Sequence, residues 1–304
     1  MSENSKELSY IEQITEASDY MESMIVNFFR DDLAHDDKFV PLVGLILGSG
    51  LGELGEHVEQ PLIIDYATIP HFPSSTVEGH AGRFVIGTLE GRRVIIMQGR
   101  SHYYEGHTMK KIVFPVYVMK QLGVSSLIVT NAAGGMNRSF HAGDLMLIQD
   151  HINFTGDHPL IGPNDAEVGV RFQDMSTAYD RDYGILLKQL SEKISSTGGA
   201  THPLREGVYC GITGPTYMTP SELTMLALLG GDAIGMSTVG EVAAARHAGL
   251  RVLGITCITD MAVGEELEPL SHEQVMAVAE QTKPRFMSLV RAFLREMDVE
   301  VNAR

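Results

Sequence analysis

The chain has 304 residues, 44% of them hydrophobic, and a formal net charge of −16 at pH 7. This length and apolar content support a well-buried core. The negative charge argues against nucleic acid or an anionic membrane as a partner. No apolar stretch is long enough to span a bilayer, and residues 1–10 lack a signal-peptide core, so we expect a cytoplasmic protein.

The cysteines and histidines indicate no metal site. Cys210 and Cys257 are isolated in apolar runs, a pattern typical of buried reduced thiols. The 12 histidines show neither an HExxH motif nor paired Cys/His spacing. We therefore predict no metal.

The predicted elements begin with an amphipathic N-terminal helix over about 11–29, inside a segment 8–30. Apolar runs predict strands at Val43–Leu47, Phe84–Gly87, Val94–Gln98, Leu127–Thr130, Leu145–Gln149, Gly207–Gly211, Ala233–Gly235 and Val252–Ile258. Continuously apolar strands are typical of an α/β sheet covered by helices on both faces. Since no linker or repeat interrupts the chain, we predict one domain over 1–304 with its core at about 40–295.

Capping boxes predict where three later helices begin. They are Thr219-x-x-Glu222, Thr238-x-x-Glu241 and Ser271-x-x-Gln274. Tyr217 and Met218 precede the first of these helices, and Met236 and Ser237 precede the second. Unpaired N–H groups and the positive end of the helix dipole lie at such turns, which favours a ligand site there.

Polar or small residues follow four of the predicted strands, where α/β proteins bind ligands. The first is the loop Gly48-Ser49-Gly50-Leu51-Gly52. It lacks the third glycine of a dinucleotide fingerprint, since that place holds Glu53, and it lacks the Gly-Lys-Ser/Thr of a phosphate loop. A plain tight turn explains the glycines but not Ser49.

The second strand end has the most charged and titratable side chains. If the segment after Gly99 is extended, Arg100, His102 and Tyr104 alternate onto one side. A guanidinium and an imidazole can hold an oxyanion, and a phenol can reach a sugar hydroxyl. Glu105 can orient a neighbouring base, although a surface loop with ordinary salt bridges is the alternative.

The third strand end is the run of small residues Asn131-Ala132-Ala133-Gly134-Gly135, which suits a flat ligand against the backbone or simply close packing. The fourth follows Ala233–Gly235. His80, between glycines, is either a mobile gate or a hydrogen-bonded loop histidine. Together these ends predict a phosphate pocket.

The order of motifs resembles the trimeric purine nucleoside phosphorylases, including the related methylthioadenosine phosphorylases, over about residues 40–295. The motifs are Gly48-Ser-Gly-Leu-Gly52, Gly79-His-Ala-Gly-Arg83, Gln98-Gly-Arg-x-His-x-Tyr-Glu-Gly106, Thr130-Asn-Ala-Ala-Gly-Gly135, Gly143-Asp-x-Met-x-Ile148, Asp150-His-Ile-Asn153, Gly235-Met-Ser-Thr-Val239 and Ala245-Arg-His247.

The resemblance implies a mixed central sheet flanked by helices, a homotrimer, and no cofactor beyond the co-substrate inorganic phosphate. Phosphate would displace the base of a purine nucleoside to give (2-deoxy)ribose 1-phosphate, a purine-salvage reaction. By motif, phosphate would be held by Ser49, Arg100, His102, Ala132 and Ser237. The sugar would be held by Tyr104, Met236 and His272. The base would be held by Ala133, Gly134, Tyr217, Met218, Ile234, Thr259 and Asp260.

Two positions depart from relatives that act on inosine and guanosine. Those usually carry Glu where this chain has Met218 and Asn where it has Asp260. Loss of the carboxylate removes a charge-assisted bond to purine N1–H worth roughly 1.5–3 kcal/mol. We therefore expect 6-aminopurines such as adenosine to be preferred, with Asp260 accepting from the 6-amino group or, protonated, donating to N7. Met218 as mere packing is the alternative, as is a 6-oxopurine enzyme, since a buried aspartic acid can also donate to O6.

His272 argues against methylthioadenosine as the main substrate, because an imidazole suits a 5′-hydroxyl better than a thioether. In the family, a neighbouring subunit closes the sugar pocket from the region of 154–160, and Phe154 and His158 are both candidates here. A hydride-transfer dehydrogenase and a non-catalytic nucleoside-binding protein are the rival classes. Glu53 disfavours the first, and the intact Arg100, His102 and Ser237 disfavour the second.

Overall fold

The computed structural model describes residues 8–30, 39–48, 51–74, 81–198, 203–267, 269 and 271–298. Its centre is a mixed sheet in the order β2-β3-β4-β1-β5-β8-β7-β6-β9. The strands are β1 (Val43–Leu47), β2 (Glu59–Asp65), β3 (Arg83–Leu89), β4 (Arg92–Gln98), β5 (Ser126–Gly135), β6 (Leu145–Asn153), β7 (Arg205–Gly211), β8 (Ala233–Gly235) and β9 (Arg251–Met261).

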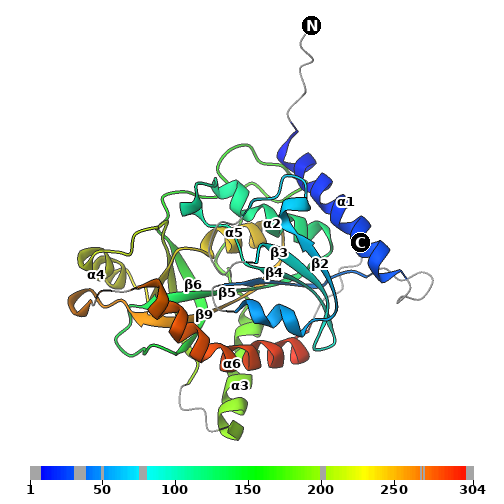
Figure 1. The fold of residues 1–304 in the computed structure, drawn as a ribbon. Coiled ribbons are helices and arrows are strands. Elements are labelled where there is room, and N and C mark those ends of the chain that lie inside the picture. The colour runs from blue at the N-terminus through cyan, green and yellow to red at the C-terminus, as the bar shows by residue number, and fades with distance from the viewer. Residues whose placement is uncertain are drawn as a thin grey trace.

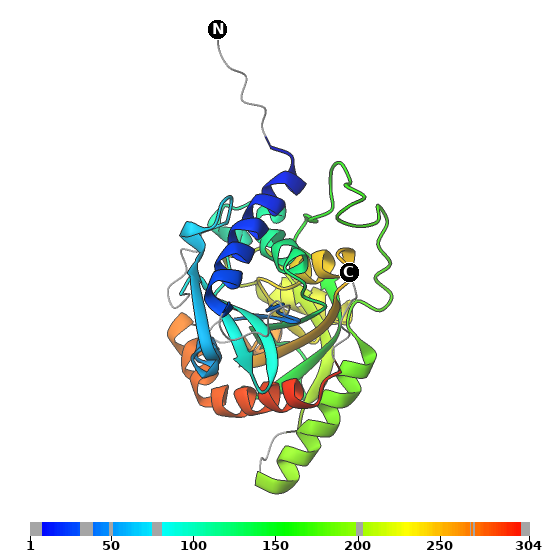
Figure 2. The ribbon, with the colours of Figure 1, turned by 90° about the vertical axis from the view of Figure 1, so that its right-hand side faces the viewer.

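Helices cover both faces of this sheet (Figures 1 and 2). α1 (Tyr10–Phe29), α2 (Met109–Gln121) and α5 (Val239–His247) pack on one face, and α3 (Arg181–Gly198) and α6 (His272–Glu296) pack on the other. α4 (Pro220–Leu228) lies at one end, and four short 3-10 helices, η1 (Gly52–His57), η2 (Tyr66–Thr68), η3 (Tyr103–Glu105) and η4 (Gly264–Glu266), complete the described elements. The predicted α/β fold with a mixed, helix-flanked sheet is confirmed.

Part of the sheet closes on itself. β9 runs parallel to β5 and antiparallel to β6, so β5, β8, β7, β6 and β9 form a closed ring of pairings. β1 and β4 pair in parallel beside this ring. The carboxyl ends of β1, β4 and β8 and the last residues of β5 and β9 therefore meet in one region.

All eight predicted strands are found, but the structure contains one strand that was not predicted and extends another beyond its predicted end. β2 was not predicted: it is an edge strand that pairs only with β3, with an exposed first half that includes Pro61, a residue tolerated at edges. β5 continues through Gly135 instead of ending at Thr130. The small residues after Thr130 are thus part of a strand, which corrects the expectation that they follow one.

The predicted capping boxes mark the beginnings of α4, α5 and α6 as expected. η1, and not an α-helix, follows the glycine loop, and Glu53 within it pairs with Lys283 of α6 at 2.5 Å. In the described part of the chain, we find no helix with the length and hydropathy of a membrane span.

Candidate active site

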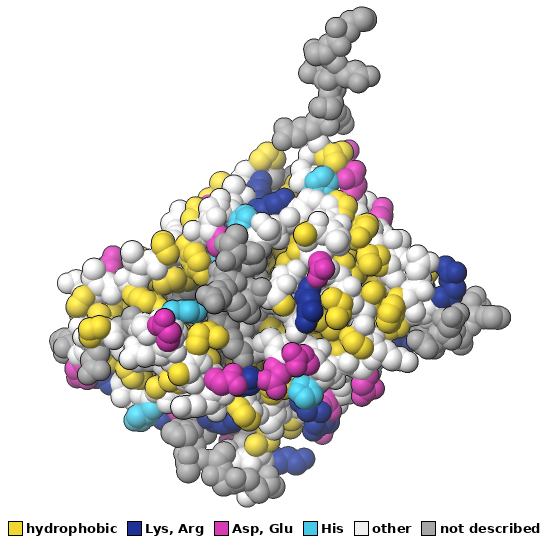
Figure 3. All heavy atoms as spheres, viewed as in Figure 1, with side chains coloured by type: hydrophobic (Ala, Val, Ile, Leu, Met, Phe, Trp, Pro, Cys, Tyr) yellow, Lys and Arg dark blue, Asp and Glu magenta, His cyan; other side chains and the backbone are white. Residues whose placement is uncertain are grey.

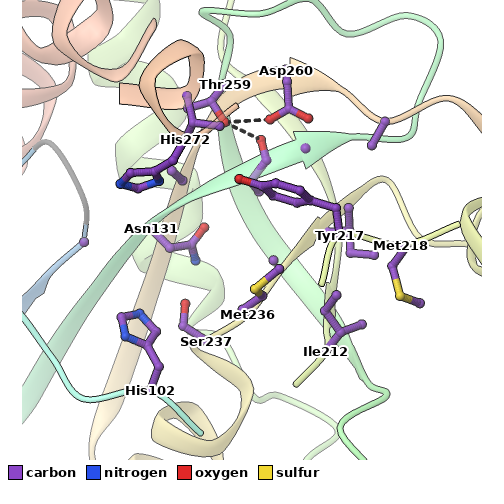
Figure 4. Close-up of a pocket in the computed structure, with 18 of the residues that line it drawn as sticks. His102, Asn131, Ile212, Tyr217, Met218, Met236, Ser237, Thr259, Asp260 and His272 are labelled. Atoms are coloured by element: carbon purple, nitrogen blue, oxygen red, sulfur yellow. Dashed lines mark hydrogen bonds between the residues drawn. The ribbon is translucent and has the colours of Figure 1, made fainter. Parts of the chain in front are cut away.

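A cavity of about 380 Å³ opens where these strand ends meet (Figure 4). The predicted residues that line it are Arg100, His102, Tyr104, Ala132, Ala133, Gly134, Tyr217, Met218, Ile234, Met236, Ser237, Thr259, Asp260 and His272. They come from segments that lie as far apart in sequence as Arg100 and His272. The fold thus brings the four predicted strand ends to one site.

Arg100 lies at one end of the cavity and is almost fully buried, with 2% of its surface exposed. Its guanidinium donates to Glu241 Oε2 at 2.6 Å, to Thr238 Oγ1 at 3.4 Å and to the Thr130 carbonyl oxygen. These bonds fix the orientation of the guanidinium plane. The surface-loop alternative for Arg100 is therefore wrong.

His102 is held beside Arg100 by Glu105. The Glu105 carboxylate accepts the backbone N–H of His102 at 2.6 Å and lies 3.2 Å from the His102 Nδ1 atom. The rings of His102 and Tyr104 stack with centroids 4.9 Å apart and an angle of 12° between their planes. Glu105 therefore lies next to the cavity wall and orients a residue that lines it.

The segment that carries these residues is not extended as expected. Tyr103–Glu105 forms η3, and Gly106 ends it with a φ of 91°. The Glu105 contacts with the backbone and ring of His102 favour this tight turn over an extended chain. Stacking of neighbouring rings, and not strand alternation, places His102 and Tyr104 on the same wall.

Ser237 and Thr238 form an unusual turn before α5. Thr238 has a φ of 77° and a ψ of −51°, and Val239 N–H donates to the Ser237 carbonyl at 2.9 Å, the geometry of a classic γ-turn. Thr238 Oγ1 accepts from Asn131 Nδ2 at 2.8 Å and lies 3.1 Å from Ser237 Oγ. The turn points the Ser237 side chain into the cavity (Figure 4).

Asn131 is a lining residue that the sequence reasoning treated only as part of a run of small residues. Its side chain is buried, with 3% exposed, and its Oδ1 finds no partner among the described residues. Figure 4 shows the amide between His102 and His272. A buried acceptor without a partner in a cavity wall is suited to a ligand hydroxyl.

The opposite end of the cavity combines apolar side chains with one carboxyl group. Met218, Ile212 and Leu223 supply apolar surface, and Asp260 stands at the end of β9. Thr259 Oγ1 donates to Asp260 Oδ1 at 2.9 Å. Burial raises the pKa of Asp260 above its ordinary value, and the Thr259 hydrogen bond opposes that shift.

Glycines bring the backbone close to the cavity at two points. A Cβ on Gly134 would lie 2.9 Å from Ala262 Cβ and 3.0 Å from Asp260 Oδ2. A Cβ on Gly235 would lie 2.2 Å from the hydroxyl of Tyr209, which is buried below it. A side chain at either position would collide with these protein atoms, so close packing of the protein itself accounts for both glycines.

Two predicted residues, Ser49 and His80, lie outside the described residues, while Gly48 beside Ser49 lines the cavity. The sequence reasoning missed eight residues that also line it: Asn131, Ile212, Leu223, Gly235, Ala262, Leu267, Pro269 and Val275. Of these, only Asn131 and Gly235 belonged to motifs already noted. No group of three or more potential metal-binding side chains occurs within the described ranges.

Comparisons with known proteins agree with this geometry. The family model described as "Phosphorylase superfamily" matches residues 42–295. The chain is 57% identical to purine nucleoside phosphorylase 1 of Bacillus subtilis over 258 residues, 85% of this chain and 93% of that protein. A structure of Schistosoma mansoni purine nucleoside phosphorylase with adenosine aligns with a TM-score of 0.85 at 37% identity, covering 96% of this chain and all of that one. A Schistosoma purine nucleoside phosphorylase with hypoxanthine gives a TM-score of 0.85 at 36% identity, covering 96% and 99%.

The fold is therefore that of the phosphorylase superfamily. Within it, the chain belongs to the purine nucleoside phosphorylases, and it is an enzyme of that family. The resemblance read from the motifs is confirmed.

Proposed function

We propose that this enzyme splits purine (2′-deoxy)ribonucleosides with inorganic phosphate and prefers 6-aminopurines such as adenosine. The products are the free base and (2-deoxy)ribose 1-phosphate. The observation that carries the proposal is a single cavity with Arg100 and His102 at one end and Met218 with Asp260 at the other. The reaction requires no group beyond its two substrates.

The phosphate end supplies hydrogen-bond donors of the kind that a dianion needs. The donors are the Arg100 guanidinium, the His102 ring, the Ser237 hydroxyl and the backbone N–H of Ala132. Ser49, which lies outside the described residues, is expected to join them by the family resemblance alone. Because Arg100 and His102 are already held by carboxylates, they require little reorganisation when phosphate binds. A phosphate dianion fixed below the sugar stabilises the positive charge that develops on the ring as the glycosidic bond breaks.

The middle of the cavity is suited to the sugar. Tyr104, Met236 and His272 line it, and His272 is the first residue of α6. We assign the 5′-hydroxyl to His272, since an imidazole forms a stronger hydrogen bond with a hydroxyl than with a methylthio group. This arrangement favours nucleosides over methylthioadenosine.

The base end favours adenine by hydrogen-bond complementarity. Adenine presents the N7 acceptor beside the 6-amino donor. A protonated Asp260 matches both, since its hydroxyl donates to N7 while its carbonyl oxygen accepts from the amino group. A 6-oxopurine presents two acceptors at the same edge, and the Met218 thioether is only a weak acceptor for its N1–H. Donation to N7 also stabilises the departing purine anion, a form of general acid catalysis worth ~10²–10⁴-fold.

The relatives show that this scaffold accommodates both kinds of base. One Schistosoma structure contains adenosine and another contains hypoxanthine. The preference in this chain therefore rests on its own Met218 and Asp260. A 6-oxopurine substrate is the second candidate, because protonated Asp260 can also donate to O6.

We further propose that the enzyme is a homotrimer with sites near subunit boundaries. The loop between β6 and α3 stands out from the body of the molecule (Figure 2). Several of its large apolar side chains are exposed. Phe172 is 90% exposed, Ile161 63% and Val170 59%. On another face, hydrophobic side chains gather over α4, where Leu228 and Leu229 are exposed (Figure 3). Such surfaces are typical of subunit contacts.

Base release from adenosine with and without phosphate tests the reaction. Phosphate-dependent release of adenine together with ribose 1-phosphate supports phosphorolysis. Equal release without phosphate identifies a hydrolase instead, and binding without release identifies an inert nucleoside-binding protein. Light scattering at several protein concentrations tests the trimer.

A further inference from the structure

Glu241 is a buried carboxylate beside the phosphate end of the cavity, although a negative charge there opposes the binding of an anion. Only 3% of its surface is exposed. We propose that Glu241 is a positioning residue that holds Arg100 and the Ser237–Thr238 turn in one geometry for phosphate. This inference rests on the proposed function, because it assumes that Arg100 and Ser237 bind phosphate.

One oxygen atom of Glu241 joins the two halves of the site. Oε2 accepts from the Arg100 guanidinium at 2.6 Å and from the backbone N–H of Thr238 at 3.0 Å. Arg100 follows β4, whereas Thr238 lies between β8 and α5, 138 residues away in sequence. A shift of this oxygen therefore displaces both halves relative to each other.

The turn at Thr238 needs such support. A non-glycine residue with a φ of 77° is strained, and it persists only where neighbouring bonds hold it. Several bonds do so: Glu241 accepts from the Thr238 backbone, Asn131 Nδ2 donates to the Thr238 hydroxyl at 2.8 Å, and Val239 N–H donates to the Ser237 carbonyl at 2.9 Å. Because Ser237 precedes Thr238, the same bonds set the position of the Ser237 hydroxyl.

An ordinary helix cap does not account for Glu241. Two other capping-box glutamates of the described residues are on the surface: Glu12 accepts from Ser9 N–H at 2.7 Å in α1, and Glu222 accepts from Thr219 N–H at 2.8 Å in α4, both in exposed contacts. Glu241 makes the equivalent bond but is buried and shares its oxygen with Arg100. Buried ion pairs contribute little net stability because desolvation offsets the attraction, so stability alone gives no reason to place one here.

In this proposal the position of Glu241 Oε2 matters and its negative charge does not. Two conservative variants test these two properties separately. In Glu241→Gln, the amide oxygen can occupy the place of Oε2 and accept both bonds, while the charge is lost. In Glu241→Asp, the charge remains but the side chain is one methylene too short to reach both partners. The control is Glu12→Ala, which removes a capping-box carboxylate from a helix that does not line the cavity.

The experiment measures KM for phosphate and for adenosine in the full-length enzyme, with thermal unfolding to confirm that each variant is folded. We expect Glu241→Asp to raise the phosphate KM at least tenfold and the adenosine KM less than threefold. Glu241→Gln should stay within threefold of the wild type for both, and Glu12→Ala should change neither.

Three results would overturn the inference. They are a phosphate KM that rises in Glu241→Gln but not in Glu241→Asp, a phosphate KM unchanged in both, and phosphate and adenosine KM values that rise together. Wild-type enzyme that releases no base with phosphate would refute the proposed function instead, so the two failures are distinguishable.

Discussion

The hydroxyl of Thr259 donates a hydrogen bond to Asp260 Oδ1 over 2.9 Å, at the end of β9. This bond fixes the plane of the carboxyl group and occupies one lone pair of Oδ1. The other oxygen, Oδ2, lies close to Gly134, on the strand across which the base would lie. The pair thus presents one defined carboxyl edge to a purine.

The first prediction concerns pH. Because the pKa of Asp260 is raised by burial, its protonated form persists to higher pH than that of an ordinary aspartic acid, whose pKa is about 3.9. In the proposed function, protonated Asp260 is the donor to N7, so kcat/KM for adenosine should fall as the pH rises through this raised pKa. This fall of kcat/KM with pH should be absent in Asp260→Asn, whose amide donates at every pH. If kcat/KM instead rises with pH in the wild type, and this rise disappears in the variant, the carboxylate is the active form.

The second prediction concerns base preference. Combining Met218→Glu with Asp260→Asn restores an acceptor for N1–H and an amide for O6 and N7. We expect the ratio of kcat/KM for inosine to that for adenosine to rise by about 10- to 100-fold, the value of one charge-assisted hydrogen bond. Met218→Leu is the control, since it keeps the volume and adds no acceptor. If the control shifts the ratio as much as the double variant, packing at residue 218 sets the preference.

The third prediction concerns the flat wall of the cavity. In Gly134→Ala, the new methyl group would lie 3.0 Å or less from both Asp260 and Ala262. We expect KM for adenosine to rise at least tenfold while KM for phosphate changes less than threefold, because the clash lies at the base end. Gly52→Ala places its methyl group in open space and should change neither value. Equal effects on both substrates would indicate a general distortion of β5.

The fourth prediction concerns stability. Glu90, in the turn between β3 and β4, accepts from Arg295 Nε at 2.5 Å and from Arg291 Nε, both on α6. The Arg295 hydrogen bond is the largest factor that lowers the pKa of Glu90. Glu90→Gln should therefore reduce the free energy of unfolding by about 0.5–1 kcal/mol at neutral pH, with exposed Glu56→Gln as the control.

The pH dependence of this effect has a defined sign. The contribution of a carboxylate with a lowered pKa is complete above its unfolded value of about 4.3, and it is lost as the pH falls through the folded value. The difference between wild type and Glu90→Gln should therefore shrink below pH 4. A difference that is constant with pH would contradict the ion-pair explanation.

Local sequence predicted the parts of the fold whose signal is local. The apolar run Val43–Leu47 and the short strand Ala233–Gly235 have the predicted bounds, because strands buried on both faces are apolar throughout. The capping boxes located the beginnings of three helices because their contacts join residues only three positions apart. β2 gave no such signal, because its exposed residues and Pro61 belong to an edge.

The internal architecture of the site required the folded chain. Glu241 was recognised as a capping residue, but its bond to Arg100 spans 141 residues and has no sequence signature. The register of β5 against β9 shifts between Ala133 and Gly134, and such irregularities change where side chains point. Asn131 was missed for another reason: the predicted strand ended at Thr130, whereas β5 continues through Gly135.

The most direct test of the account is kcat/KM of the wild-type enzyme for adenosine and for inosine, measured at saturating phosphate and neutral pH. We expect adenosine to be favoured, because Met218 offers only a weak acceptor to N1–H and Asp260 matches the N7 and amino edge of adenine. Inosine favoured tenfold would contradict it.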